Sequence, residues 1–407
     1  MEIRIEHFNE VFEPGGAIRE RYRPLFETLE RIGKEDFADR SARADEKLRE
    51  LGATFPLDED PAGKERILPA NWIPRIIPKD HREILSRGLL QRGYAINAWL
   101  LDLYNGEQDV VPEEIVESSV FYRSGPLPDY SVPVHIYGPD VVQLAPKEYM
   151  VLEDNVRVPS GVAYSEAIRR AVLESMRDLC ELYRVSAISA YYAVLRRSLE
   201  IAAPPGVREP CVAVVSRGEE DSAYFEHKRI AEACNIRLLT LAECQIRGGE
   251  VWDRSDGRRI DVIYRRFDED YIQSDLPELE AVYLAGKVNL VNAPGVGVAD
   301  DKAVFPYVPA MIERYLGEEP LLKNVATLSP SEPEQREEIL DRLDELVLKP
   351  REGYGGQGLM VGPEADRENL EHARKALKEN PTGFVAQETI DFSTHVLNAA
   401  ANGSEPV

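Results

Sequence analysis

The stretch LVLKPREGYGGQGLMVGP, residues 346–363, determines how the fold of this chain is interpreted. Gly353, Gly355 and Gly358 match G-x-G-x-x-G, the spacing of a dinucleotide-binding loop. Such a loop opens a helix whose N-terminus meets a pyrophosphate, whereas these glycines lead into a second apolar run, LMVGP. The stretch therefore predicts a glycine-rich hairpin that folds over a nucleotide, with Lys349 at the end of its first strand to meet phosphate oxygens. A passive surface turn is the alternative, but the Lys-Pro step and the density of glycines argue against it.

Two weaker signals lie on either side of this hairpin. Gln387 and Glu388, in VAQETI, end an apolar strand, where backbone groups and a carboxylate can meet the edge of an adenine. Lys302, in NAPGVGVADDKAV, follows a strand and a loop and enters a helix predicted over residues 300–317. Taken alone, the first pattern also fits the plain end of a strand. The second also fits a capping aspartate beside a solvated lysine.

A stronger signal lies far upstream, where VPVHIYGPDVVQLAPKEYMVLEDNVRVPSG predicts strand, turn, strand. Asp140 falls on the first strand, and Glu153 and Asn155 fall on its partner. Because residues two apart project from the same face of a strand, these oxygen-bearing side chains are expected to converge. Carboxylate and amide oxygens suit Mg²⁺, and Arg157 on the same face can meet a phosphoryl oxygen through paired hydrogen bonds. The polar solvent face of an amphipathic hairpin is the alternative.

Composition narrows the class of protein. The chain has 407 residues, of which 43% are hydrophobic and 30% charged, the balance of a globular protein with two or three structural units. Its net charge of −24 is unfavourable for binding a nucleic-acid backbone, which requires basic stripes. A well-solvated acidic surface explains the charge, as does attraction for a cationic substrate such as a polyamine. We expect no nucleic-acid partner.

The cysteines and the N-terminus bear on localisation. Cys180, Cys211, Cys234 and Cys244 form no C-x-x-C pair and are too few for a disulfide framework, so we expect reduced thiols. The first residues, MEIRIEHFNE, carry charges throughout and lack the apolar region of a secretory signal. No apolar run approaches the ~18–20 residues that span a bilayer. We therefore expect a cytoplasmic protein with no membrane partner.

Periodicity predicts the order of elements along the chain. Residues 1–60 are helical in pattern, and Asp80 can cap a long apolar helix that follows. Between residues 210 and 295 strands and helices alternate, which is typical of βαβ units on a parallel sheet. After the linker TLSPSEPEQ, Ser331 and Glu334 predict a capping box at the start of a further helix.

Taken together, these motifs resemble those of the ATP-grasp enzymes. In ordinary ATP-grasp chains the metal motif comes last, whereas here it precedes the lysines by about 150 residues. That order is similar to the circularly permuted ATP-grasp family, type 2, which is related to glutathionylspermidine-synthase-like proteins. The resemblance extends nearly end to end, through YMVLEDNVRVPSGVAY, SAYFEHKRIA, DVIYRRFDEDYI, NAPGVGVADDKAVFPYVPAMI and VAQETIDFST.

The resemblance implies an α/β fold, a circularly permuted ATP-grasp with an adjoining Rossmann-like βαβ (pre-ATP-grasp) domain. Residues 1–165 would form N-terminal helices and the permuted lobe with the metal-binding hairpin. Residues 166–300 would form a Rossmann-like substrate domain, and residues 301–407 the ATP-binding lobe. The implied cofactors are ATP and Mg²⁺. The positions that match the family's ATP-binding residues are Lys302, Lys349, Gly353, Tyr354, Gly355, Gly356, Gly358, Gln387 and Glu388. The positions that match its metal ligands are Asp140, Glu153 and Asn155.

The resemblance also implies an activity, carboxylate–amine ligation. A small-molecule or peptide carboxylate attacks the γ-phosphate of ATP to give an acyl phosphate, and an amine, less readily a thiol, displaces the phosphate. Lys302, Lys349, Arg157 and Mg²⁺ would neutralise the charge on the transferring phosphoryl group. Arg265 and Arg266 are candidates to hold the substrate carboxylate, and Glu226 and His227 are weaker ones. A surface salt bridge is the alternative for each of these four.

Two other classes of protein stay open at this point. One is an ATP-binding scaffold or sensor without catalysis. The other is a nicotinamide oxidoreductase, suggested only by the glycine spacing and disfavoured by the strand after the loop.

The family continues past the adenine hinge into a strand with an Asp-Leu-Arg motif, whereas this chain ends at THVLNAAANGSEPV. We therefore expect the hairpin begun at Asn402-Gly403 to be incomplete, the chain to be mobile from residue 392, and ligation to be poor.

Overall fold

The computed structural model describes residues 8–56, 65–128, 132–353 and 358–396. Contacts within it divide the chain into two compact units. Unit 1 is formed by Met1–Ile77, Ser160–Leu290 and Ser393–Val407, and unit 2 by Pro78–Pro159 and Val291–Phe392. Each unit is therefore assembled from segments that lie far apart in the sequence. The three-part division expected from the sequence stays a prediction.

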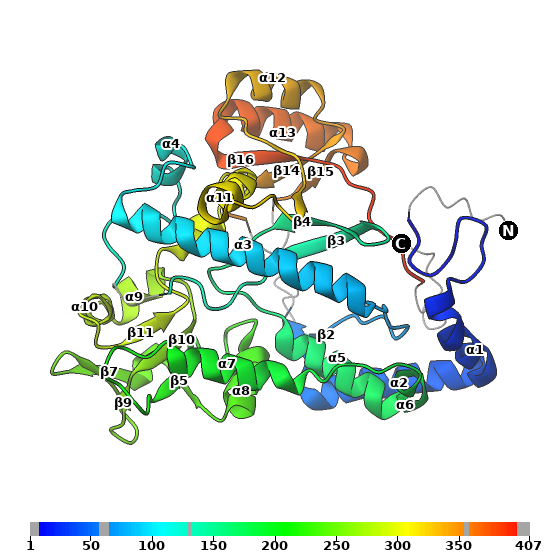
Figure 1. Cartoon of the computed structure of the whole chain (residues 1–407), viewed down its shortest axis with the longest axis horizontal. Helices are drawn as coiled ribbons and strands as arrows, with labels where there is room; N and C mark the ends of the chain where they lie inside the picture. Colours follow the sequence, from blue (N-terminus) through cyan, green and yellow to red (C-terminus); the bar gives the residue numbers. More distant parts are fainter. Residues whose placement is uncertain (1–7, 57–64, 129–131, 354–357, 397–407) are drawn as a thin grey trace. The chain divides into compact units, whose positions relative to one another are not determined.

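A helical layer in unit 1 is built from two stretches of sequence. Its helices are α1 (Arg23–Ile32), α2 (Lys34–Leu51), α5 (Val162–Ser175) and α6 (Arg177–Glu181). α2 packs along α5 (Figure 1), and the layer buries an apolar cluster that includes Tyr22, Leu25, Leu48 and Met176. Gly52 ends α2 in the left-handed conformation that favours glycine, with φ 71°. The antiparallel strands β1 (Thr54–Pro56) and β2 (Glu65–Ile67) follow.

The alternating segment forms the sheet of unit 1. Its strands are β5 (Val212–Ser216), β6 (Arg237–Thr240), β10 (Val262–Arg266) and β11 (Asn289–Val291), in the order β11-β10-β5-β6. β5 pairs in parallel with both β10 and β6, and its residues are buried throughout, as expected for the centre of a Rossmann-like sheet. The helices of this part are α7 (Ser189–Ile201), α8 (Tyr224–Cys234), α9 (Asp270–Asp275) and α10 (Glu278–Leu284). A small antiparallel sheet contains β7 (Cys244–Arg247), β8 (Glu250–Asp253) and β9 (Arg259–Ile260).

Unit 2 is organised around a long helix, α3 (Lys79–Asn105), which packs against α11 (Val308–Leu316). The short helix α4 (Glu113–Glu117) follows α3 in the chain. Beside α3 lies a three-stranded sheet of β3 (Asp140–Ala145), β4 (Glu148–Glu153) and β12 (Lys323–Asn324). Gly88 permits the close approach of α3 to Leu322, since a Cβ there would lie 2.4 Å from Leu322 Cγ.

The second sheet of unit 2 contains the strands on either side of the glycine-rich stretch, whose Tyr354, Gly355 and Gly356 lie outside the described residues. Its strands are β13 (Thr327–Leu328), β14 (Leu346–Pro350), β15 (Met360–Val361) and β16 (Phe384–Glu388), in the order β13-β16-β14-β15. The helices α12 (Pro333–Asp341) and α13 (Arg367–Glu379) lie over it in Figure 1 and bury Leu346 and Leu348 with Ala386. Because successive strand residues point to opposite faces, Val347 and Lys349 lie on the face away from these helices.

Three local expectations about helix starts are wrong. α3 begins at Lys79 behind Pro78, and Asp80 pairs instead with Lys147 at 2.7 Å. The Ser331–Glu334 capping box is absent, because Pro333 begins α12 and the Ser331 hydroxyl bonds Ser329 Oγ at 2.6 Å.

The helix expected over 300–317 begins only at Val308. Residues before it form a turn and the 3-10 segment η4 (Phe305–Tyr307). Pro306 and Pro309 lie in the first turns of η4 and α11, where the missing N–H is tolerated, and a continuous helix through both is disfavoured.

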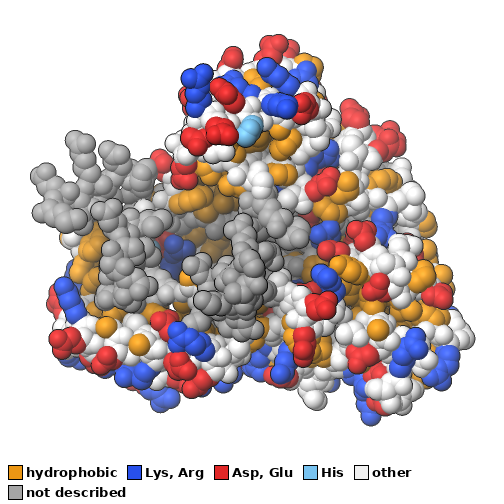
Figure 2. All heavy atoms as spheres, turned by 180° about the vertical axis from the view of Figure 1, so that it is seen from behind, with side chains coloured by type: hydrophobic (Ala, Val, Ile, Leu, Met, Phe, Trp, Pro, Cys, Tyr) orange, Lys and Arg blue, Asp and Glu red, His pale blue; other side chains and the backbone are white. Residues whose placement is uncertain are grey.

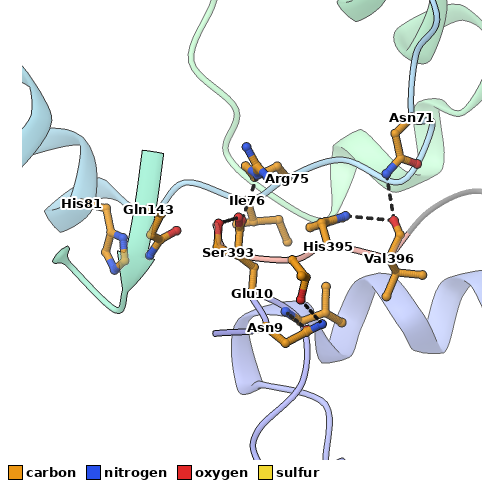
Figure 3. Close-up of polar contacts among 12 residues, drawn as sticks. Asn9, Glu10, Asn71, Arg75, Ile76, His81, Gln143, Ser393, His395 and Val396 are labelled. Carbon is orange, nitrogen blue, oxygen red and sulfur yellow. Dashed lines mark hydrogen bonds and ion pairs between the residues drawn. The ribbon is translucent and has the colours of Figure 1, made fainter. Parts of the chain in front are cut away.

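The last described residues are held to the first ones within unit 1 (Figure 3). Thr394 pairs with Asn9 in a parallel bridge, and the Ser393 hydroxyl donates to Glu10 at 2.6 Å. Arg75 pairs with the same carboxylate at 3.0 Å, and the Asn71 amide donates to the Val396 carbonyl at 2.8 Å. Residues 397–407, where the expected hairpin at Asn402-Gly403 falls, lie outside the described residues.

The surface seen in Figure 2 mixes acidic and basic side chains with scattered hydrophobic ones. This mixture agrees with the reading of the net charge of −24 as a well-solvated surface. Within the described part of the chain, every helix is too short or too polar to cross a membrane.

Candidate nucleotide and metal site

The hairpin β3–β4 brings two acidic side chains together in unit 2. Its register places Asp140 directly opposite Glu153, at the open end of the hairpin. The turn at the other end is closed by Lys147, which adopts a left-handed φ of 66°. Asn155 was expected on the partner strand but lies outside it, because β4 ends at Glu153. The Asn155 carbonyl accepts a hydrogen bond from the Gly138 N–H at 2.9 Å, so the chain continues beside the residues that precede β3.

Lys302 joins this hairpin to the glycine-rich stretch. Its ammonium Nζ lies 3.1 Å from Glu153 Oε1 and donates to the Gly353 carbonyl at 2.6 Å. The side chain is buried, so both contacts lie in a region of reduced dielectric where charge pairs are stronger than in water. The segment around Lys302, a weak signal in the sequence, thus connects the acidic hairpin to the glycine-rich stretch.

Lys349 completes a cluster of two cations and two carboxylates. Burial lowers its pKa from the usual lysine value, Glu153 and Asp140 act in the opposite direction, and Lys302 adds to the lowering. Burial likewise raises the pKa of Asp140, and the neighbouring Glu153 carboxylate adds to the rise, while both lysines oppose it. The four groups therefore act on one another electrostatically, and their formal charges cancel.

Gln387 and Glu388, the two residues predicted to contact an adenine, both contact other side chains or backbone groups of this chain. The Gln387 side chain is buried, and its amide donates to the Leu152 carbonyl at 3.3 Å and to Thr327 Oγ1 at 3.2 Å. Glu388 pairs with Arg342 at 2.8 Å. Gln387 therefore links β16 to β4, one residue before Glu153. Its role at an adenine stays a prediction, as does that of Glu388.

Arg157 lies just beyond the hairpin. Its backbone N–H donates to both oxygens of Asp300, at 3.0 and 3.2 Å, and its guanidinium packs over the Phe121 ring at 4.5 Å. Gly297 makes this packing possible, because a Cβ there would lie 2.9 Å from Arg157 Cδ. The expected contact of Arg157 with a phosphoryl oxygen stays a prediction.

The residues proposed for the substrate carboxylate lie in unit 1. Arg265 and Arg266 end β10 and are both buried, and as neighbours on a strand they point to opposite faces of the sheet. Arg265 pairs with Glu269 at 3.1 Å, and Arg266 pairs with Glu226 at 3.4 Å. Neither arginine is therefore in a surface salt bridge.

His227 and Glu226, on α8, contact the residues that end β5 and β10. Ser216 Oγ lies 2.8 Å from His227 Nδ1, and burial, aided by Arg266, lowers the pKa of His227 to about 3. Glu226 accepts hydrogen bonds from the N–H groups of Gly161 and Ala163 at the start of α5. The polar groups of this cluster thus hold α5 onto the carboxyl ends of the strands, where ligands bind in open α/β sheets.

The donor atoms of the hairpin residues are of the kind that binds a magnesium ion. Two facing carboxylates with an amide two residues on supply the hard oxygen donors that Mg²⁺ prefers, and the Lys302 ammonium already balances Glu153. Among the described residues there is no cluster of three or more His, Cys, Asp or Glu side chains suited to a metal. Asp140 and Glu153 supply two such side chains, and the Asn155 amide would be the third protein donor if the site holds Mg²⁺.

Several polar residues around this cluster were not predicted from the sequence. Asp300, which is half-buried, and the buried Asp301 and Arg351 hold the segments next to the two lysines. The buried Asp154 lies between Glu153 and Asn155. Asp154 pairs with Arg92 at 2.5 Å, and both side chains are fully buried. The acidic pair just before Lys302 was the available signal, but its partners lie about 50 residues or more away in the sequence.

Comparison with known families bears on the fold and on one of the two alternative classes of protein. Residues 74–404 match the family described as circularly permuted ATP-grasp type 2. The chain belongs to that family. The family and the α/β fold expected from the motifs are thus confirmed, and the nicotinamide oxidoreductase loses its support.

Several relatives of this ATP-grasp chain are known. A protein of Frankia alni named "Putative glutamate--cysteine ligase 2-3" is 37% identical over 407 residues, which cover 95% of this chain and 47% of that protein. An uncharacterized protein of Synechocystis sp. is 35% identical, over 95% of this chain and 84% of its own length. An uncharacterized protein of Mycobacterium tuberculosis is 36% identical, over 95% and 73%. The chain spans about half the length of the Frankia relatives it matches.

One solved structure supports the fold of the ATP-grasp chain. A glutathione synthetase-like effector from Globodera pallida, in its apo form, superposes with a TM-score of 0.53 over 88% of this chain and 83% of that chain. The sequence identity is 11%, so this likeness concerns the fold alone.

Proposed function

We propose that this chain is an ATP-dependent carboxylate–amine ligase that works through an acyl phosphate. The observation that carries the proposal is the cluster in which Lys302 Nζ lies 3.1 Å from Glu153 Oε1, with Asp140 opposite Glu153 and Lys349 in electrostatic range. A site that transfers a phosphoryl group must bind both a polyanion and its counter-cation. Two ammonium groups beside two carboxylates supply both functions.

The charges of the cluster suit an exchange of partners. In the free protein the buried Lys302 ammonium and the half-buried Glu153 carboxylate neutralise each other, so neither charge lacks a counter-ion. When nucleotide binds, Lys302 and Lys349 turn to phosphate oxygens, and Asp140, Glu153 and Asn155 are left to hold Mg²⁺. Held by these residues, Mg²⁺ would supply positive charge to offset the negative charge that develops during transfer.

The reaction we propose follows from this arrangement. A substrate carboxylate oxygen attacks the γ-phosphorus, the bond to the β-phosphate oxygen breaks, and ADP leaves with that electron pair. Lys302, Lys349 and Arg157 would stabilise the phosphoryl oxygens in this step. An amine nitrogen then attacks the acyl carbon, and phosphate leaves as the amide forms and the amine loses a proton. Arg265 and Arg266 stay candidates to hold the carboxylate.

The names of two relatives suggest the substrate class. The two Frankia proteins carry the printed name of a glutamate–cysteine ligase, with 37% identity to this chain. We therefore infer an amino acid or a small peptide as the carboxylate, and an amino compound as the acceptor.

The proposal is tested by measuring ADP release with magnesium and ATP over a panel of amino acids and amines. We expect ADP release that depends on both a carboxylate and an amine and that falls at least 100-fold in Lys302→Met, because a preorganised charge is lost. Lys323→Met is the matched control, since Lys323 lies in the same unit with an exposed side chain, and it should retain full activity. ATP binding without turnover on any pair would favour the scaffold or sensor instead.

A further inference from the structure

Three consecutive residues before η4 reach three different parts of unit 2. Asp300 accepts hydrogen bonds from the N–H groups of Val156 and Arg157, at 2.6 and 3.0 Å, just beyond the acidic hairpin. Lys302 reaches Glu153 on that hairpin and the Gly353 carbonyl of the glycine-rich stretch. Asp301, between them, turns to the segment that follows Lys349.

The partner of Asp301 is Arg351, and the pair is bidentate. Arg351 Nε donates to Asp301 Oδ1 at 2.8 Å, and Nη2 donates to Oδ2 at 2.7 Å. Arg351 also donates to Ser118 Oγ, at 3.0 Å, and to the backbone carbonyls of Ile115 and Thr382, at 3.0 and 3.2 Å. Asp301 is 1% exposed and Arg351 is 7% exposed, so this fork is desolvated and its directions are fixed.

Each member of the ion pair lies within two residues of one of the two lysines. Asp301 directly precedes Lys302, and Arg351 follows Lys349 by two residues. The Lys302 N–H also lies 3.4 Å from the Arg351 carbonyl as a backbone hydrogen bond, so the segments touch through main chain and side chain together. A shift of either segment would change the spacing of the two ammonium groups.

We propose that Asp301 and Arg351 are a positioning pair that sets the distance between Lys302 and Lys349 for the phosphates of one nucleotide. This inference rests on the function proposed above and goes beyond it by assigning a role to residues outside the family's matched positions. Neither residue touches the nucleotide in this account. Their effect is therefore on phosphate recognition and not on the adenosine part of the ligand.

A purely stabilising role is the competing explanation, and energetics make it the weaker one. Burying two charges costs about as much desolvation as their attraction returns, so a buried ion pair is weak support for stability by itself. A planar guanidinium bound through two nitrogens nevertheless fixes distance and direction better than an apolar contact of the same size. Fixing the spacing of two catalytic segments is a use that requires this property.

The test compares Asp301→Asn with Asp253→Asn. Asparagine at 301 keeps an oxygen for the Ala303 N–H, which Asp301 now accepts at 2.9 Å, but it loses the charge and the second acceptor for Arg351. Asp253 is also fully buried and pairs with Arg237, but it lies in unit 1. Calorimetric titrations of ATP and AMP, in the presence of Mg²⁺, are made on the whole chain for the wild type and both variants.

We expect Asp301→Asn to weaken ATP binding at least tenfold and AMP binding no more than twofold. Asp253→Asn should lower the melting temperature and leave the ratio of ATP to AMP affinity unchanged. Arg351→Lys, which keeps a charge but loses the fork, should give an intermediate loss for ATP, and it also serves if Asp301→Asn does not fold. Equal losses for ATP and AMP in both variants at Asp301 and Arg351 would overturn the positioning role. Failure of the wild type to bind ATP would instead overturn the proposed function, and this inference with it.

Discussion

The pKa of Lys349 is lowered and that of Asp140 is raised, so each side chain loses its charge more easily than it would in water. Desolvation by the surrounding protein is the main cause of both shifts. Lys349 is half-buried and Asp140 lies at the exposed end of β3, and the opposite charges of Glu153 and Lys302 act against both shifts. Such shifts are concentrated at functional sites because the same charges that serve a ligand are poorly solvated without it. These two pKa shifts therefore support a nucleotide site more directly than the spacing of the glycines does.

At this scale we predict that Lys349→Ala weakens ATP binding more than AMP binding. Loss of one charge-assisted hydrogen bond costs roughly 1.5–3 kcal/mol, or about tenfold or more in affinity, and it acts on phosphates and not on the base. Gln387→Ala should weaken both nucleotides to a similar extent, because we place it at the adenine end. Calorimetric titration checks both, and Lys323→Ala serves as the control. Equal losses for ATP and AMP in Lys349→Ala would contradict the assignment.

A second residue-scale prediction concerns His227 and acid stability. The folded side chain stays neutral down to a pKa of about 3, whereas the unfolded one takes up a proton near 6.5. Between these values the unfolded state binds more protons, so the contribution of His227 to stability is present above about pH 6.5 and is lost as pH falls toward 3. From pH 7 to pH 5 this loss is about 2 kcal/mol.

His227→Gln keeps an acceptor for the Ser216 hydroxyl and should remove that loss. Urea unfolding at pH 7 and pH 5 measures it, with the exposed His372→Gln as a control that behaves like the wild type. If His227→Gln and the wild type lose the same free energy of unfolding between the two pH values, His227 is not buried in a neutral form.

At the scale of elements, periodicity predicted most of what the structure contains. The helices over residues 23–51, the strand pair that carries Asp140 and Glu153, and the parallel sheet between residues 210 and 295 all follow from local apolar patterns, whereas the register of the pair and the order of the strands do not. Helix starts were predicted poorly, because proline and tertiary partners such as Lys147 override a side chain that could cap. The pairing of Asp301 with Arg351 could not be predicted from a local pattern, because the two residues lie 50 residues apart.

The close packing of Gly362, directly after β15, gives a prediction about the stability of unit 2. Gly362 follows β15, and a Cβ there would lie 2.3 Å from the Leu343 carbonyl oxygen and 2.6 Å from that of Leu346, both backbone atoms. Gly362→Ala should therefore destabilise unit 2 by about 1–3 kcal/mol through overpacking. Gly15→Ala, at a position with open space around it, should be nearly neutral. Thermal unfolding of the two variants checks this, and equal melting temperatures would contradict the close packing.

At the scale of the whole molecule, the sequence predicted the family and the fold class but not which segments share a unit. Residues 1–77 join residues 160–290 through contacts between α2 and α5, which are distant in sequence and have no local signature. The proposed phosphate and metal residues, by contrast, all fall in unit 2 and were found because each has its own motif. Arg265 and Arg266, in unit 1, show the limit of motif reading, since both are buried in ion pairs.

We propose that Glu153, beside Lys302, belongs to a magnesium–nucleotide site, and Glu153→Gln tests this assignment on the intact chain. Glutamine keeps the size of the side chain but removes the charge that a divalent cation requires. Folding should barely change, while the barrier to phosphoryl transfer should rise by about 3 kcal/mol if the chain turns over ATP. Glu148→Gln, on the exposed face of the same hairpin, is the matched control.

The most direct measurement is a calorimetric titration of ATP into the wild type, Glu153→Gln and Glu148→Gln, with and without Mg²⁺. We predict that Mg²⁺ tightens ATP binding to the wild type and to Glu148→Gln but not to Glu153→Gln. Binding of ATP without Mg²⁺ should persist in Glu153→Gln, because Lys302 is then free for phosphate. If the wild type does not bind ATP, or if Mg²⁺ tightens binding equally in all three proteins, the account is contradicted.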